Sequence, residues 1–208
     1  MTTNLTSSFI AVSGQIADST ITLPKLANGT ANKLIGFNGA GVPAEVAAGA
    51  MSLVQAQTLS SAVADITFSS LDINNDGMYF LFFEVATSAT GEVSLQIDGD
   101  TTTTNYYSQW RTEGASTIGT SRANSPSFTN VNSATATAGW GTIQLTTDGY
   151  SICYMNSHYQ TGVNIQTNQA VISSKNGANA NITSVTLHNL AGNFSIGSKA
   201  ALYKVVRA

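Results

Sequence analysis

The chain has 208 residues, a net charge of −3 and only 9% charged residues, against roughly 25% in typical soluble domains. Its hydrophobic fraction of 42% is large enough for a packed core, so the low charge does not indicate disorder. The eight cations are scattered along the sequence, which argues against nucleic-acid binding. The single cysteine, Cys153, excludes an intrachain disulfide framework and fits assembly in a reducing cytoplasm. No apolar run is long enough to span a bilayer, and no secretory signal is recognised at the N-terminus.

Residues 1–49 are predicted to form a polar attachment arm and an extended stem. Turn-forming residues recur in the stem, at Asn28-Gly29, Asn38-Gly39 and Gly41-Val42-Pro43. One chain cannot bury the short apolar segments between these turns well, whereas three parallel copies wound together can. We therefore predict a homotrimeric stem in which sister chains share the apolar residues Leu23, Leu26, Leu34, Ile35, Phe37 and Val46.

Residues 50–64 contain neither glycine nor proline. Leu53, Ala56, Leu59 and Val63 recur at a spacing of three to four residues, which is the helical period. The pattern predicts a short helical collar, with an irregular linker as an equal alternative.

From Asp65 to the end of the chain, at residue 208, the apolar period changes to two. Residues 114–138 are mostly small or polar and predict a long loop with at most one weak strand. Trp140, between two glycines, is expected to anchor the core. Eight or nine short antiparallel strands separated by turns indicate a mainly β head domain, either a sandwich or a barrel. The predicted strands begin near residue 66 and then cover residues 78–85, 92–97, 106–113, 140–146, 150–159, 163–174, 182–190 and 200–206.

One stretch resembles a metal site. Asp72, Asn74, Asp76 and Gly77 match the first half of a calcium-binding loop, but Phe83 occupies the position of the required acidic ligand. A hairpin turn is the favoured interpretation, and for Asp98 and Asp100, which flank Gly99, a turn is likewise favoured over a cation site.

Catalytic groups are sparse. Apart from Asp98 and Asp100, the acidic residues are spread thinly, and His158 and His188 lie in predicted strands with polar neighbours. The sequence contains no phosphate-binding glycine loop and no zinc-ligand spacing. We therefore expect no enzyme activity, no cofactor and no metal.

The candidate ligand residues are aromatic and polar. Tyr107, Trp110 and Arg111 lie close together in one predicted strand, and Arg122 and Asn124 lie in the predicted loop. Aromatic rings beside hydroxyl, amide and guanidinium groups suit sugars, and loops on a rigid sandwich often carry recognition. The favoured alternative places Tyr106 and Trp110 in the core and Tyr107 at an edge, because aromatic residues are core residues by default.

Two regions resemble virion proteins of tailed bacteriophages. Residues 21–30, ITLPKLANGT, and 34–43, LIGFNGAGVP, are similar to a segment near the N-terminus of many phage tail-fibre proteins. Residues 66–68 (ITF), 79–82 (YFLF), 93–97 (VSLQI) and 105–107 (NYY) resemble a jelly-roll module of phage fibre and decoration proteins. The ending GNFSIG at 192–197 with ALY at 201–203 fits the same module.

The resemblance implies a trimer with stems at one end and jelly-roll heads, residues 65–208, at the other. It implies a virion protein assembled in the bacterial cytoplasm, namely a short tail fibre or receptor-binding protein. Residues 1–49 would dock on a tail adaptor or the capsid, and the head would meet host cell-surface glycan. A capsid decoration protein, or head fibre, is the alternative. A polysaccharide-degrading tail protein ranks third, because it needs a suitably spaced carboxylate pair.

Overall fold

The computed structural model describes residues 33–37, 43–47, 51–114, 118–133, 135–161, 164–174 and 179–205. The chain divides into two compact units, residues 1–49 and 50–208. In the first unit, strands β1 (Lys33–Phe37) and β2 (Pro43–Ala47) pair antiparallel. These strands contain Leu34, Ile35, Phe37 and Val46, but the structure describes only their backbone. Leu23 and Leu26 lie outside the described residues. The shared stem therefore stays a prediction.

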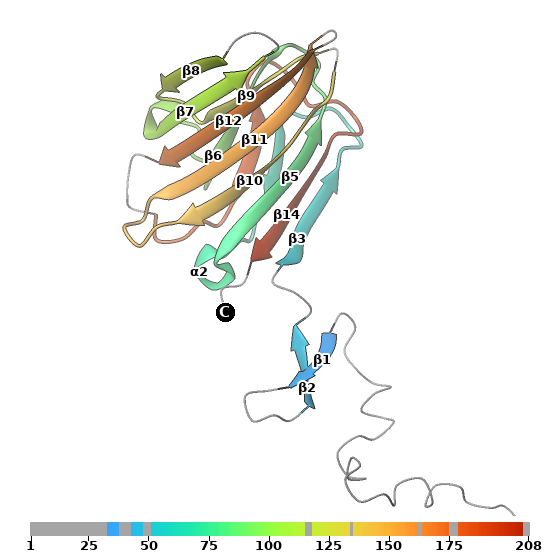
Figure 1. The fold of residues 1–208 in the computed structure, drawn as a ribbon, viewed down its shortest axis with the longest axis vertical. Helices are drawn as coiled ribbons and strands as arrows, with labels where there is room; N and C mark the ends of the chain where they lie inside the picture. The colour runs from blue at the N-terminus through green and yellow to red at the C-terminus, as the bar shows by residue number, and fades with distance from the viewer. Residues whose placement is uncertain are drawn as a thin grey trace, which may run out of the picture. The chain divides into compact units, whose positions relative to one another are not determined.

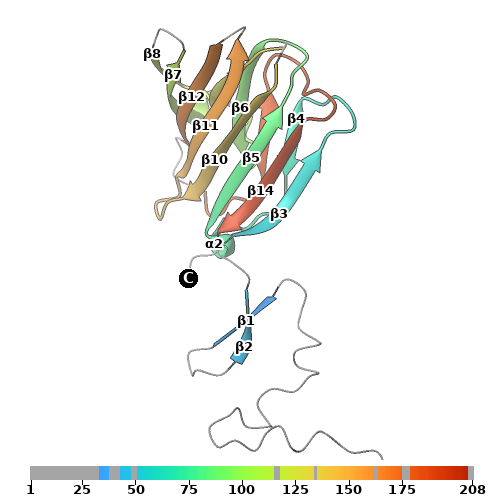
Figure 2. The ribbon, with the colours of Figure 1, turned by 45° about the vertical axis from the view of Figure 1, so that its right-hand side comes forward.

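The second unit is a β-sandwich of two antiparallel sheets (Figure 1). Figure 2 shows the small sheet behind the large one. The eight-stranded sheet has the order β3-β14-β5-β10-β11-β12-β7-β8, and the four-stranded sheet has the order β4-β13-β6-β9. The strands of the large sheet are β3 (Met51–Thr58), β5 (Met78–Val85), β7 (Tyr106–Glu113), β8 (Ile118–Ala123), β10 (Thr137–Leu145), β11 (Ser151–Thr161), β12 (Asn164–Ser174) and β14 (Lys199–Val205). Those of the small sheet are β4 (Asp65–Phe68), β6 (Gly91–Ile97), β9 (Ser127–Val131) and β13 (Val185–Asn189).

Two short helical segments complete the unit, α2 (Ile73–Asp76) and the 3-10 turn η1 (Thr103–Asn105). In the part of the chain that the structure describes, no helix has the length and apolar character needed to cross a membrane.

The core lies between the sheets and follows the period of two. On β5, Tyr79, Leu81, Phe83 and Val85 are all buried, because alternate side chains of a strand point to the same face. The ring of Phe83 meets that of Phe128 on β9 edge-on, with centroids 5.6 Å apart, and joins the two sheets. The predicted inward set of β6, namely Val93, Leu95 and Ile97, is confirmed.

The predicted helical collar is wrong, because residues 51–58 form strand β3 beside β14. The register shifts between Leu202 and Tyr203, so Val54 is an extra residue on β3. Such a bulge breaks the alternation of side chains along a strand, and two residues of the apparent helical pattern, Leu53 and Ala56, are exposed on β3. Val54 and Leu59 pack against the core, whereas Leu53 is exposed.

The prediction of a long loop with at most one weak strand at residues 114–138 is wrong in part, because this stretch contains two strands. It contains β8, which pairs with β7, and β9, which pairs with β6. Both strands are short and lie at sheet edges, and the polar side chains of β8 are exposed. β8 and β9 are therefore strands because they pair with β7 and β6, although the side-chain pattern of this stretch gives little indication of a strand.

Trp140 is not a core anchor. It points to the outer face of the large sheet with 42% exposure, because its neighbours Gly139 and Gly141 occupy the inward positions of β10. A Cβ at Gly139 would lie 2.3 Å from the backbone oxygen of Asn156 and 2.4 Å from the ring of Phe83.

We expect Gly139→Ala to lower the free energy of unfolding by about 1–3 kcal/mol, because backbone cannot yield to the added methyl group as a flexible side chain can. Urea unfolding followed by circular dichroism measures this change. Gly119→Ala is the matched control, since nothing lies within 4 Å of its Cβ position. Equal midpoints for the two variants would contradict the packing described for Gly139.

Cys153 is 1% exposed, and burial raises the pKa of its thiol to about 12. Because the thiolate is the reactive form, we expect an aromatic disulfide reagent at pH 8 to label the folded protein only as fast as it unfolds. In denaturant, one equivalent should react at once. Rapid labelling without denaturant would show that the thiol is accessible.

Candidate functional site

The predicted ligand residues lie mainly on the outer face of the large sheet. On β7, Tyr106 and Ser108 are buried, whereas Tyr107, Gln109 and Arg111 alternate with them and are exposed. Tyr106 is held inside by its hydroxyl, which accepts a hydrogen bond from the Ile97 N–H at 3.0 Å. The strand therefore presents one polar face to solvent.

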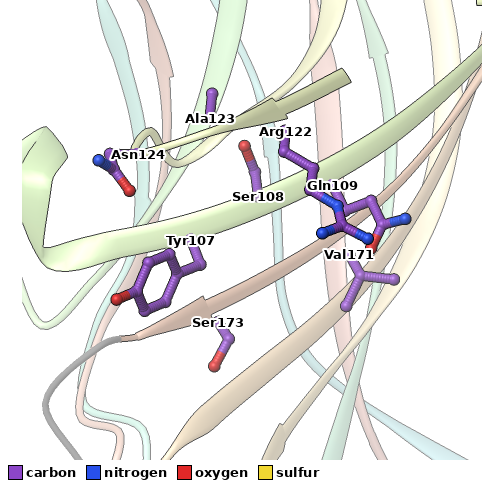
Figure 3. Close-up of a pocket in the computed structure, with 8 residues that line it drawn as sticks. All are labelled: Tyr107, Ser108, Gln109, Arg122, Ala123, Asn124, Val171 and Ser173. Atoms are coloured by element: carbon purple, nitrogen blue, oxygen red, sulfur yellow. The ribbon is translucent and has the colours of Figure 1, made fainter. Parts of the chain in front are cut away.

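A groove of about 660 Å³ crosses β7, β8 and β12 at this end of the sheet (Figure 3). Register places Gln109 of β7 between Arg122 of β8 and Val171 of β12. Figure 3 shows the Arg122 guanidinium extending toward Gln109 and Val171. The groove is lined by Tyr107, Ser108, Gln109, Arg122, Ala123, Asn124, Val171 and Ser173.

The structure thus brings together three of the five predicted ligand residues, Tyr107, Arg122 and Asn124. Arg111 lies on the same face but lines a neighbouring hollow, and it forms an ion pair with Glu113 at 2.6 Å. Trp110 is partly buried against the core, as the favoured alternative expected, and it also lines that neighbouring hollow.

Sequence reasoning missed Gln109, Val171 and Ser173. Val171 and Ser173 come from β12, about sixty residues after β7 in the chain. Alternation along each strand identifies which positions face outward, but a single sequence does not show that β7 and β12 lie side by side.

The groove combines apolar surface with hydroxyl and amide groups and one positive charge. Arg122 is exposed, and among the described residues no carboxylate forms an ion pair with it. A guanidinium offers planar, paired donors that match a carboxylate or phosphate. The remaining groups supply hydroxyl, amide and aromatic contacts. This arrangement suits a hydroxylated ligand that carries an anionic group.

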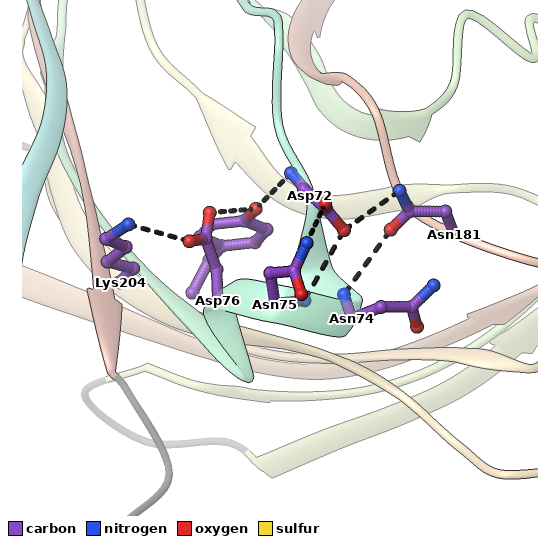
Figure 4. A network of polar contacts seen from close by, with 7 residues as sticks. Asp72, Asn74, Asn75, Asp76, Asn181 and Lys204 are labelled. Carbon is purple, nitrogen blue, oxygen red and sulfur yellow. Dashed lines mark hydrogen bonds and ion pairs between the residues drawn. The ribbon is translucent and has the colours of Figure 1, made fainter.

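The acidic stretch at Asp72–Asp76 is structural (Figure 4). Asp72 caps α2 by accepting a hydrogen bond from the Asn75 N–H at 3.4 Å, and it also accepts one from Asn181 Nδ2 at 3.1 Å. Asp76 accepts hydrogen bonds from the Tyr79 hydroxyl at 2.7 Å and from Lys204 Nζ at 2.8 Å. The predicted hairpin is wrong, because the flanking strands β4 and β5 belong to different sheets and a helical turn links them.

The second acidic pair also forms a turn, as predicted. Asp98 Oδ1 accepts hydrogen bonds from the Thr183 and Ser184 N–H groups at 2.6 and 3.0 Å. Asp100 accepts hydrogen bonds from the Thr102 N–H and from Asn105 Nδ2, both at 2.9 Å. Within the described ranges, no cluster of three histidine, cysteine or acidic residues is suited to a metal.

The two histidines bond to side chains of neighbouring strands. His188 Nδ1 lies 2.6 Å from Asp65 Oδ1 in the small sheet, and His158 Nδ1 lies 3.0 Å from Thr167 Oγ1. Neither contact involves the groove of Figure 3.

No protein-family model, no curated protein and no solved structure matches this chain. The ligand of the groove is therefore inferred from its side chains.

The Asp76 network predicts a dependence of stability on pH. Burial opposes ionisation of Asp76, but hydrogen bonds from Lys204 and Tyr79 outweigh it, so the pKa of Asp76 lies below its usual value. A lowered folded-state pKa stabilises the protein above the unfolded-state pKa, and this contribution disappears as the pH falls through the folded-state value. Lowering the pH should therefore reduce the free energy of unfolding of the wild type more than that of Asp76→Asn. At pH 7 the variant should be less stable by about 2 kcal/mol.

Urea midpoints from pH 7 to pH 2.5 measure this difference. Asp148→Asn, at an exposed turn residue, is the control and should follow the wild type. Parallel pH curves for Asp76→Asn and the wild type would contradict a folded-state pKa below the usual one.

Proposed function

We propose that this chain is a non-enzymatic virion protein of a tailed bacteriophage, a short tail fibre or receptor-binding protein. Its sandwich, of jelly-roll type, would present the groove at Tyr107, Arg122 and Asn124 to glycan on the host surface. The observation that carries the proposal is this groove, which lies on rigid paired strands and combines a ring, an amide and an exposed guanidinium.

The chemistry of the groove supports a saccharide. Sugar rings present apolar faces and surrounding hydroxyl groups, which the Tyr107 ring and the Gln109 and Asn124 amides can meet. Arg122 would bind a carboxylate or phosphate substituent of the glycan. In the described residues, the carboxylates of Asp72, Asp76, Asp98 and Asp100 are held by protein donors, which gives a hydrolase mechanism little support.

The order of segments along the chain, a predicted stem followed by a β-sandwich, supports a structural role in a phage particle. In the proposed assembly, three copies join through the apolar segments of the stem, and residues 1–49 dock on a tail adaptor or the capsid. Only 9% of the residues are charged, and in the proposed assembly neighbouring subunits would cover part of this weakly charged surface. Immunogold labelling of intact particles tests the location. Label on the tail supports a receptor-binding protein, and label over the capsid supports a decoration protein instead.

We expect Arg122→Ala to weaken binding of the full chain to host cells or their purified surface polysaccharide roughly tenfold, or about 1.4 kcal/mol. The loss should shrink at high salt, because the contact is electrostatic and exposed. The thermal unfolding midpoint should not change. Lys199→Ala removes the same charge from β14, outside this groove, and is the matched control.

Binding by biolayer interferometry and oligomeric state by sedimentation provide the measurements. A full chain that is folded and trimeric yet binds neither cells nor polysaccharide would contradict the proposal.

A further inference from the structure

We infer that the groove at Arg122 is one end of a longer channel that binds an oligosaccharide across the strands, with Trp140 and Tyr154 as its stacking platform. This inference rests on the proposed function and specifies its ligand as an extended chain of sugars.

The channel follows from two adjoining hollows. A second hollow of about 510 Å³ lies on the same outer face and shares Gln109 and Val171 with the groove of Figure 3. Arg111, Trp140 and Tyr154 are among the residues that line it. Because the two hollows share lining residues, they adjoin each other on this face, and together they make up the proposed channel.

Two cross-strand rows of outward side chains cross this channel. One row runs Tyr154, Val171, Gln109, Arg122 over β11, β12, β7 and β8. The next row runs Trp140, Asn156, Gln169, Arg111 over β10, β11, β12 and β7. Each row contains an aromatic ring on its β10 or β11 side and an arginine on its β7 or β8 side.

The dimensions require a ligand longer than one sugar. Neighbouring strands lie about 4.8 Å apart, so the four spacings from Arg122 on β8 to Trp140 on β10 span roughly 19 Å. A single sugar ring at Arg122 would leave the aromatic end empty. An oligosaccharide would contact both ends.

The aromatic end is held in place. Trp140 is 42% exposed and stacks on Phe80, with ring centroids 6.2 Å apart and an interplanar angle of 26°. Phe80 stacks in turn on Phe82 at 6.0 Å. Tyr154, at 50% exposure, offers a second ring close to Trp140 in the same hollow. Rings that are fixed before binding lose little entropy when a sugar stacks on them.

Amide groups favour a saccharide over an apolar protein surface. Asn156 pairs with Trp140 in register, and its Oδ1 has no hydrogen-bond partner among the described residues. This oxygen is buried, so the amide must rotate toward the hollow before a sugar hydroxyl can donate to it. An apolar partner would leave Asn156 and Gln169 unsatisfied, which is costly.

The test measures how binding depends on chain length. The probes are size-fractionated fragments of host surface polysaccharide, from single sugars to long oligomers, titrated into the full chain by calorimetry. Affinity should rise with length until the channel is filled. Trp140→Ala and Tyr154→Ala should each weaken binding of long fragments roughly tenfold, as expected for a central aromatic contact. They should leave the shortest fragments that bind unaffected.

Tyr150→Ala is the matched control for Tyr154→Ala, because Tyr150 is 40% exposed and lines neither hollow. Acrylamide quenching of the wild type gives a readout that needs no variant. Long fragments should protect Trp140, which is more exposed than the partly buried Trp110.

Binding that depends on Arg122 but not on Trp140, Tyr154 or fragment length would overturn the inference and leave the proposed function standing. Loss of self-association in Trp140→Ala, with polysaccharide affinity unchanged, would overturn it in favour of a protein interface. Failure of every fragment and of the intact polysaccharide to bind the wild type would overturn both proposals.

Discussion

The alternation of side chains on the large sheet determines both its packing and its exposed surface. In the strands that cover the four-stranded sheet, the face that packs against it is mainly apolar, and the other face is left to solvent. On β5 this places Tyr79, Leu81 and Phe83 inside and leaves Phe80 and Phe82 on the outer face. The ligand-binding residues proposed above occupy the outward half of the same pattern, so the constraint that builds the core also positions the site.

Glycine has a specific role within that constraint. Gly139 and Gly141 take the inward positions of β10, where a Cβ would collide with Phe83 or Met155, and Trp140 is therefore directed outward. The tryptophan then completes an aromatic stack with Phe80. Close packing on one side of the strand thus accompanies a preorganised aromatic surface on the other.

The sequence predicted the sandwich better than it predicted the site. Strands with clean alternation, such as β6 and β7, were identified close to their observed bounds. Errors arose where the alternation is interrupted, as at the bulge opposite Leu202, or where side chains are small and polar, as in β8. Tyr107, Arg122 and Asn124, selected from the sequence as candidate ligand residues, line one groove, but their neighbours on β12 depend on long-range pairing that one sequence does not contain.

The groove and its extension draw on β7, β8, β10, β11 and β12, which are separate stretches of the chain held together by sheet register. An epitope over this surface is therefore conformational. Antibodies raised against linear peptides would meet the residues of single strands, and their binding to denatured protein would say little about whether they cover the folded surface. Antibodies selected against this face of the folded protein would recognise the assembled sheet and lose their target when it unfolds.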